Sequence, residues 1–308
     1  MSTDTETSNG AVILERIDAW QDVVSDQFAF IRKDNLAFAG LVVVALFIFL
    51  GLFGPMLAPH NPIEHDMQTD DGSIMRLAAP NADALFGTTA YGKDIFSQFL
   101  AGARPTLIVG LFGGLGTGAI GFLVGLVSGY YGGWVDEVLM RLTDLTFSLP
   151  FMPMALLLLT FVTPNIWLIT LIIAGFLWKM PARVVRSEVL SVRERTFVKS
   201  ARASGASDLR TMFVHVAPNV LPIGFLYTAY GVAWSIAAQA SLAFLGFGDP
   251  TMTSWGRMLR MVFDSGNMRI AWWWVIPPAI GIAAVTTSVF LIGRAYEEVI
   301  NPEIEAQQ

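Results

Sequence analysis

The sequence contains no cysteine, few charged residues and only three histidines. Without cysteine the chain has no disulfide, no thiolate metal site and no cysteine nucleophile. His60, His65 and His215 all lie outside the apolar segments, away from the serines within them, which argues against a Ser–His–Asp triad. His60, His65 and Asp66 lack a third spaced imidazole or thiol, so no metal site is expected there.

A phosphate-binding Gly-x4-Gly-Lys-Ser/Thr sequence is also absent. This motif cradles the phosphates of ATP in P-loop ATPases. We therefore predict that the chain is not an enzyme, that it holds no cofactor or metal of its own, and that any ATP and Mg²⁺ belong to partner subunits.

The sequence is instead rich in hydrophobic residues. Charged residues make up 14% of the chain against about 25% in a soluble domain, hydrophobic residues make up 54%, and the mean hydropathy is +0.56. A hydrocarbon core of about 30 Å needs roughly 20 apolar residues per helix. We therefore predict an all-α polytopic membrane protein with six transmembrane helices, at 36–58, 106–130, 140–162, 165–179, 220–245 and 273–293.

The distribution of lysine and arginine, which concentrate in cytoplasmic loops, predicts the orientation. Six passes with both termini in the cytoplasm place 13 of the 19 basic residues there, eight of them between 179 and 210. The net charge of -6 favours no nucleic-acid partner.

Residues 1–30 lack the features of a cleavable signal peptide, and apolar residues recurring every three or four positions between 13 and 31 predict an amphipathic helix. The predicted organisation is a cytoplasmic tail, 1–34, a transmembrane domain, 35–302, with an outer loop at 59–104 and a cytoplasmic coupling loop at 179–218, and a C-terminal tail, 303–308.

A basic segment at 197–218 interrupts the apolar runs. Its pattern predicts two short helices: Ser200 to Ala203 are compatible with a helix, Gly205 suits a left-handed C-terminal cap, and Ser207 or Asp208 suits the next N-cap. Pro218 is expected to end the second helix.

This segment resembles the EAA loop of the inner-membrane permeases of ABC importers, in which a glycine is followed by a proline thirteen residues later. Gly205 and Pro218 keep that interval, whereas Lys199 replaces the usual glutamate and Ser200 the first alanine. The resemblance implies contact with an ATPase through the following residues: Lys199, Ser200, Ala201, Arg202, Gly205, Ala206, Ser207, Asp208 and Pro218.

Further motifs, in the same order as in the family, extend the resemblance over about 32–302. The stretch 85–104 is similar to a signature of the dipeptide, oligopeptide and nickel permeases, C-type subunit, and the Gly-Tyr-Tyr-Gly-Gly at 129–133 and the Leu-Ala-Phe-Leu-Gly-Phe-Gly at 242–248 continue it. Thr89 stands where that signature has aspartate and Lys93 where it has arginine. The fold implied is that of a type I ABC importer permease.

Within the predicted spans, small residues recur every four positions from Gly113 to Gly133, all of them glycine except Thr117, with a second glycine stripe at 110, 114 and 118. Such stripes predict close helix packing, in this subunit or against a paired permease, and lining of the substrate path is the alternative. Asp144 is expected to pair with a donor such as Arg141 at the cytoplasmic interface. Trp272 to Trp274 predict an outer aromatic belt. Candidate pathway residues are Tyr227, Tyr230, Gln239 and Ser241.

Taken together, the resemblance implies a permease subunit in a prokaryotic inner membrane that works with a second homologous permease, two ABC ATPase subunits and an extracytoplasmic substrate-binding protein. Peptides are the favoured cargo, with nickel complexes and oligosaccharides as alternatives. An ion-coupled secondary transporter or a membrane scaffold would be the rival classes, but the first needs acidic coupling groups within the spans and often inverted repeats. The second does not explain the order of the motifs.

Overall fold

The computed structural model of the protein describes residues 34–63, 66–69 and 71–300, with side chains up to residue 297. In this part of the chain all regular elements are helices, and strand-like pairing is confined to two isolated bridges, Gln68 with Ile74 and Thr88 with Asp94. The all-α prediction is confirmed. The predicted helix at 13–31 and the tail at 303–308 lie outside the described residues. The helices are α2 (Asn35–Leu57), α3 (Ile95–Tyr131), α4 (Gly133–Ser148), α5 (Phe151–Thr160), α6 (Ile166–Leu177), α7 (Lys179–Val192), α8 (Thr196–Ala203), α9 (Asp208–Arg210), π-helical η1 (Thr211–Val216), α10 (Ala217–Leu242), π-helical η2 (Ala243–Phe247), α11 (Trp255–Asp264) and α12 (Trp272–Ile300).

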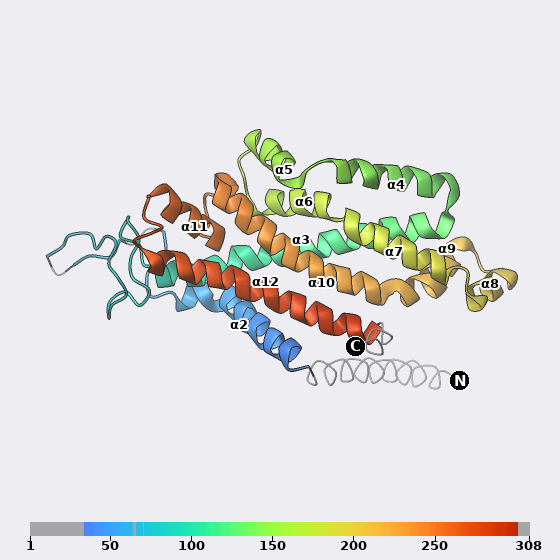
Figure 1. The fold of residues 1–308 in the computed structure, drawn as a ribbon, viewed down its shortest axis with the longest axis horizontal. Helices are drawn as coiled ribbons and strands as arrows, with labels where there is room; N and C mark the ends of the chain where they lie inside the picture. The colour runs from blue at the N-terminus through green and yellow to red at the C-terminus, as the bar shows by residue number, and fades with distance from the viewer. Residues whose placement is uncertain (1–33, 64–65, 70, 301–308) are drawn as a thin grey trace, which may run out of the picture.

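The long helices run lengthwise through an elongated bundle (Figure 1). Within the described residues, α2, α3, the unit from α9 to η2, and α12 are each long and apolar enough to cross a membrane. Two further pairs are long enough only when taken together: α4 with α5, bent by 82°, and α6 with α7, bent by 42°. Six passes result when each bent pair is one span, in agreement with the predicted number.

The boundaries differ from the prediction most clearly in the second and third spans, and in the fourth, where α7 continues the helical unit to Val192. The span predicted at 140–162 is divided in two, because α4 ends at Ser148 and the chain is extended at Leu149. A proline disfavours helical backbone at the residue before it, and Pro150 follows Leu149 directly. The second span begins at Ile95, earlier than predicted, because the Asp94 side chain accepts hydrogen bonds from the first backbone N–H groups and caps the helix.

The glycine stripes of α3 lie at its contacts with α7 and α10. A Cβ atom added at Gly114 would lie 2.5 Å from the Val232 backbone nitrogen of α10, and one at Gly125 would lie 2.6 Å from the Ala182 carbonyl oxygen of α7. Atoms of real side chains do not approach that closely, so these backbones are in contact only because the residues are glycines. Close packing within this subunit is confirmed. Gly133 is the exception, since it starts α4 and a Cβ there would meet no atom within 4 Å.

The described part of the first loop packs against the start of α12, at the left-hand end of the bundle in Figure 1. Thr88 is fully buried, its hydroxyl donates to the Met75 carbonyl at 2.6 Å, and its own carbonyl accepts from the Trp273 indole at 3.4 Å. Of the three tryptophans assigned to an aromatic belt, Trp272 is 57% exposed but Trp274 is completely buried. The prediction is therefore wrong for Trp274, because the folded loop covers it.

Asp144 forms an ion pair, as expected, but its partner is not Arg141, the donor named as an example. Arg141 bonds Glu137 one turn earlier on α4, whereas Asp144 bonds Arg183 of the neighbouring α7. Helix α4 lies alongside α7 (Figure 1), which brings Arg183 to Asp144. The pair therefore joins two helices rather than two turns of one.

Asp249 ties the segment after η2 to the start of α6. Its carboxylate accepts hydrogen bonds from the Ile166 backbone N–H at 3.1 Å and from the Thr251 hydroxyl at 2.6 Å. Burial acts to raise the pKa of Asp249, but the bonds from Thr251 and Ile166 and the charge of Arg257 outweigh it and lower this pKa below its ordinary value. The carboxylate is therefore held ionised at this junction.

Candidate coupling segment and pathway residues

The basic segment forms one end of the bundle, opposite the first loop and α11 (Figure 1). Its first helix, α8, ends where Gly205 takes a positive φ of 84°, and the Ala206 N–H bonds the Ala201 carbonyl at 3.2 Å. The Ser207 hydroxyl then accepts from the Arg210 N–H at 3.4 Å and caps the next helix. The sequence therefore predicted the helix, the glycine cap and the N-cap correctly. We call residues 196–218 the coupling segment.

The second helix does not end at Pro218. It passes from α9 through η1 into α10 without interruption, and Pro218 lies in the first turn of α10. Proline lacks a backbone N–H and clashes with the carbonyl four residues earlier in a regular helix. A π-helical turn precedes Pro218, with the Ala217 N–H bonded to the Met212 carbonyl, and widens the spacing at that point. The coupling segment is consequently a direct extension of a spanning helix.

Most of the predicted ATPase-contact residues lie on the surface. Ala201 and Ala206 are half-buried, and the others are exposed: Lys199, Ser200, Arg202, Gly205, Ser207, Asp208 and Pro218. Exposed apolar side chains accompany them, with Leu209 61% and Phe213 50% exposed. An amphipathic helix end with exposed apolar side chains can bind in a groove of another protein.

Lys199, which replaces the family glutamate, forms a salt bridge to Glu194 with 3.1 Å between Nζ and Oε2. The hydrogen bond and charge of Lys199 hold the pKa of Glu194 below its ordinary value. Both side chains are about 60% exposed, so this pair contributes little to stability. It pairs the Lys199 ammonium with a residue that lies just before the coupling segment.

Tyr130, at the end of α3, holds both halves of the coupling segment. It is 4% exposed, its hydroxyl donates to the Asp208 carboxylate at 3.0 Å, and the Arg202 guanidinium lies 4.9 Å from its ring centroid. Arg202 precedes Gly205 and Asp208 follows it, so one side chain contacts the chain on each side of the bend. The sequence analysis missed this role, although Tyr130 lies within the Gly-Tyr-Tyr-Gly-Gly motif.

Beneath Tyr130 the segment shares a hydrophobic core with the bundle. Val198 of α8 and Met212 and Val216 of η1 are buried together with Val185 and Val189 of α7. The coupling segment, α7 and the start of α10 are therefore packed around one core. Geometrically, the site can transmit a movement from the end of the bundle into its length.

The four candidate pathway residues are not brought together. Tyr227 and Tyr230 form an edge-to-face pair with ring centroids 5.9 Å apart, and Tyr230 donates to Glu297 at 2.9 Å. Gln239 is 4% exposed and its Oε1 atom has no hydrogen-bond partner within the described residues. Ser241 lines a separate surface groove. Along α10 these side chains therefore point to at least three different surroundings.

With this geometry in view, comparison with known proteins gives a consistent assignment. Residues 121–305, more than half of the chain, match the family described as binding-protein-dependent transport system inner membrane component. The chain belongs to this family. Residues 19–80 also match the N-terminal transmembrane domain of oligopeptide transport permease C.

Curated relatives of this permease carry names of the same kind. The dipeptide transport system permease protein DppC of Alkalihalophilus pseudofirmus is 31% identical over 292 residues, which cover 94% of this chain and 92% of the relative. The oligopeptide transport system permease protein OppC of Haemophilus influenzae is 31% identical over 293 residues, covering 94% and 90%. DppC of Bacillus subtilis is 28% identical over 291 residues, covering 93% and 85%.

Family membership confirms that this permease is a non-catalytic, inner-membrane subunit of an ABC importer. Permeases of this kind work with ATPase subunits and a binding protein and carry no cofactor on the permease chain. Within the described residues no group of three His, Asp or Glu side chains is arranged to hold a metal ion.

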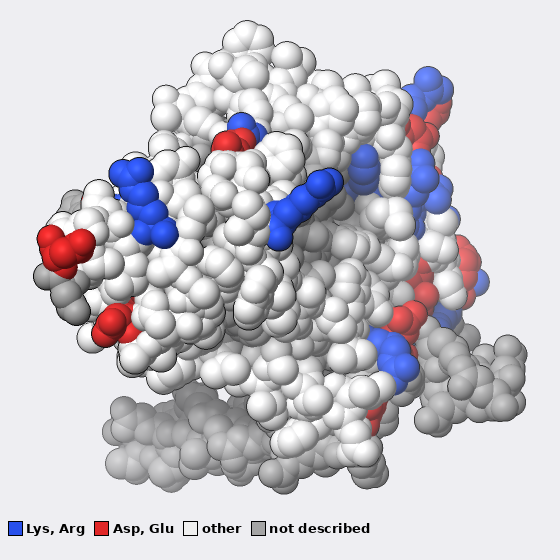
Figure 2. Space-filling model, turned by 60° about the vertical axis from the view of Figure 1, so that its left-hand side comes forward, with Lys and Arg blue, Asp and Glu red and all other residues white. Residues whose placement is uncertain are grey.

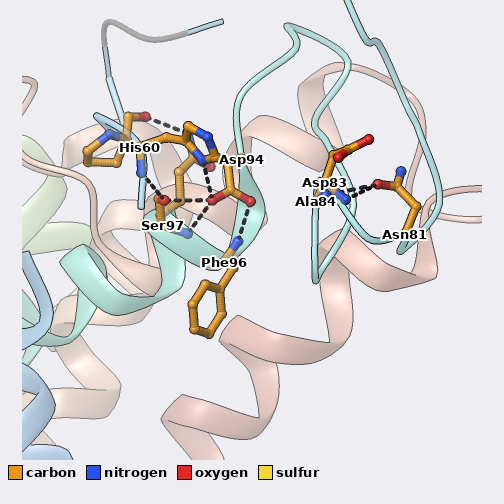
Figure 3. Close-up of polar contacts among 9 residues, drawn as sticks. His60, Asn81, Asp83, Ala84, Asp94, Phe96 and Ser97 are labelled. Atoms are coloured by element: carbon orange, nitrogen blue, oxygen red, sulfur yellow. Dashed lines mark hydrogen bonds and ion pairs between the residues drawn. The ribbon is translucent and has the colours of Figure 1, made fainter. Parts of the chain in front are cut away.

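One cluster of this permease resembles a hydrolytic triad by composition. His60, Asp94 and Ser97 lie together at the start of α3 (Figure 3), with 3.4 Å between His60 Nδ1 and Asp94 Oδ2. The Ser97 hydroxyl donates to Asp94 at 2.6 Å and accepts from the His60 backbone N–H at 3.1 Å. In a triad the serine bonds the imidazole and the imidazole bonds the aspartate. Here the carboxylate instead caps a helix and joins the end of α2 to it.

Proposed function

We propose that this chain forms one half of the translocation pathway of an ABC importer for peptides, paired with a second homologous permease and driven by two ATPase subunits. The observation that carries the proposal is the exposed coupling segment, which continues as a helix into α10. An ATPase that binds this segment would act directly on a spanning helix.

The proposed orientation places the coupling segment in the cytoplasm, where the ATPases lie, and the first loop and α11 outside, where a binding protein docks. The predominance of lysine and arginine around the coupling segment supports it. In Figure 2 charged side chains are densest along the right-hand margin, others are scattered over the left and centre, and wide areas of the surface carry no charge, as expected of a protein that contacts lipid.

In the proposed coupling, movement of the ATPases reaches the membrane through two helical units, η1–α10 and α6–α7. Closure of the ATPase pair on ATP would pull the second half of the coupling segment, and the continuous η1–α10 helix would transfer that displacement to Tyr227, Tyr230, Gln239 and Ser241. The shared core with α7 would move the α6–α7 span in the same step. Alternating access then follows from rigid-body movement of packed helices.

The names of the curated relatives support peptides as cargo. A competition assay tests this directly: uptake of a labelled dipeptide by cells containing the complete transporter is measured against excess unlabelled dipeptide, oligopeptide, nickel–histidine complex or oligosaccharide. We expect inhibition by the peptides alone. Inhibition only by nickel or only by oligosaccharide would replace the peptide assignment with that cargo.

Site-specific cross-linking tests the contact with the ATPase. Since the chain has no cysteine, Ser200→Cys introduces a single thiol in the coupling segment, and Met268→Cys places an exposed one at the opposite end as a matched control. In the purified complex we expect Ser200→Cys to cross-link to the ATPase and Met268→Cys not to do so. Cross-linking of Met268→Cys alone would reverse the proposed orientation.

A further inference from the structure

A surface groove of ≈ 420 Å³ lies where two broken spans meet. Its lining comes from the start of α5, the α6–α7 junction and α10, and includes Met152, Leu177, Lys179, Trp234 and Ser241. Helix breaks in membrane proteins commonly flank binding sites, because unwound backbone is tolerated where it lines a cavity. We call this the Lys179 groove.

Lys179 is the one charged side chain that lines the groove. The sequence analysis predicts that a cytoplasmic loop begins at this residue, and in the structure it starts α7 directly after α6. At a rise of 1.5 Å per residue it lies about 20 Å from either end of the α6–α7 unit. A partly buried cation at the junction of a bent helix pair that is long enough to cross a membrane is costly unless its charge has a partner.

No carboxylate within the described residues forms an ion pair with Lys179, whereas the nearby Arg183 has one in Asp144. The ammonium does have one neutral partner: Nζ donates to the Thr146 carbonyl in the last turn of α4 at 2.9 Å and lies 4.9 Å from the Phe147 ring centroid. A lysine has three N–H donors. Two remain for an anion in the groove.

The rest of the lining suits a peptide. Trp234 presents an aromatic surface, and methionine side chains such as Met152 adapt to ligands of different shape. The Ser241 hydroxyl donates to the Ala237 carbonyl at 2.8 Å, so its oxygen is left to accept a bond from a ligand N–H.

From these observations, and resting on the proposed peptide transport, we propose that Lys179 binds the C-terminal carboxylate of the transported peptide in this groove. The ammonium then gains the counterion that this chain does not provide, while the side chains of the peptide contact Trp234 and Met152. The coupling segment plays no part in this recognition, since it lies beyond the far end of α7.

The test compares uptake of one peptide with a free C-terminal acid and the same peptide as its amide, using the complete transporter with its binding protein. For each peptide, the uptake rate of the variant is divided by that of the wild type. This ratio cancels any preference of the binding protein for the acid or the amide. Lys179→Gln keeps a donor for the Thr146 carbonyl but removes the charge. We expect it to lower uptake of the acid roughly tenfold, in line with the loss of a charge-assisted hydrogen bond, and to leave any uptake of the amide unchanged.

Two further variants separate recognition of the peptide carboxylate from effects on the structure of the permease. Lys179→Arg should retain most uptake of the acid, and Arg183→Gln, which disrupts a neighbouring pair outside the groove lining, should affect acid and amide equally. Equal losses for both peptides in Lys179→Gln, or no loss, would overturn the proposal while leaving peptide transport intact. A wild-type complex that carries no peptide would instead refute the proposed function.

Discussion

Gly205 offers the sharpest test of the coupling segment, because its backbone conformation disfavours residues with a side chain whereas its surroundings leave room for one. Its φ of 84° lies in the left-handed region, yet a Cβ added there would meet no atom within 4 Å. Any effect of Gly205→Ala therefore comes from backbone strain rather than from a clash. The strain of a side chain in this region is about 1–2 kcal/mol.

A penalty of that size changes the equilibrium between the native bend and alternative conformations by a factor of roughly 5–30. Asparagine tolerates the left-handed conformation better than alanine, so Gly205→Asn should lie close to wild type. Gly175 provides the matched control, since it lies in a regular part of α6 and a Cβ there also meets no atom.

Two measurements test the bend at Gly205: one reports its conformation and the other its effect on coupling. Spin labels on cysteines introduced at Ser200 and Leu209, both exposed, report the distance between the two halves of the coupling segment in the purified complex. The number of ATP molecules hydrolysed per peptide transported reports coupling. We expect Gly205→Ala to broaden the distance distribution and raise ATP use per peptide, while membrane insertion is normal and Gly205→Asn and Gly175→Ala match wild type. Wild-type distances and coupling in Gly205→Ala would refute the role of the bend.

Three further variants test other contacts. Tyr130→Phe removes the bond to an exposed carboxylate, worth about 1.5 kcal/mol at most, so ATP use per peptide should rise; Tyr131→Phe, on an exposed neighbour, should not change it. Gly118→Leu overpacks the α3–α10 contact by about 1–3 kcal/mol and should lower the melting temperature of the complex, which Gly175→Ala should not do. Asp249, whose pKa is lowered below 3.8 on folding, stabilises the fold above pH 3.8 and loses this contribution as the pH falls further. The melting temperatures of Asp249→Asn and wild type should therefore differ at pH 6 and converge toward pH 3, and a difference independent of pH would contradict the linkage.

The sequence predicted most of the bundle, because apolar runs of spanning length and one glycine cap are local signals. Gly205 follows a helical stretch and precedes Ser207, so the cap and N-cap could be assigned from neighbouring residues alone. The apolar run continues across the break at Leu149, so hydropathy alone gives neither the place of the break nor the angle between α4 and α5. Pro218 was misassigned because a π-helical turn accommodates it.

The missed functional contacts all depend on residues far apart in the chain. Tyr130 reaches Asp208, 78 positions later, and Lys179 reaches Thr146 across 33 positions. A single sequence carries no signal for such pairs. Lys179 also ended the apolar run used to place the fourth span, so hydropathy gave no sign that a second helix, α7, follows α6 at once.

The central claim is that ATP hydrolysis on the partner ATPase subunits, transmitted through the coupling segment, drives peptide import. The most direct measurement is uptake of a labelled peptide into proteoliposomes containing this chain, its paired permease and the ATPases, with binding protein outside and ATP enclosed. We predict uptake that requires both enclosed ATP and binding protein and is unaffected by a protonophore. Uptake without ATP that a protonophore abolishes would contradict the account and identify an ion-coupled carrier.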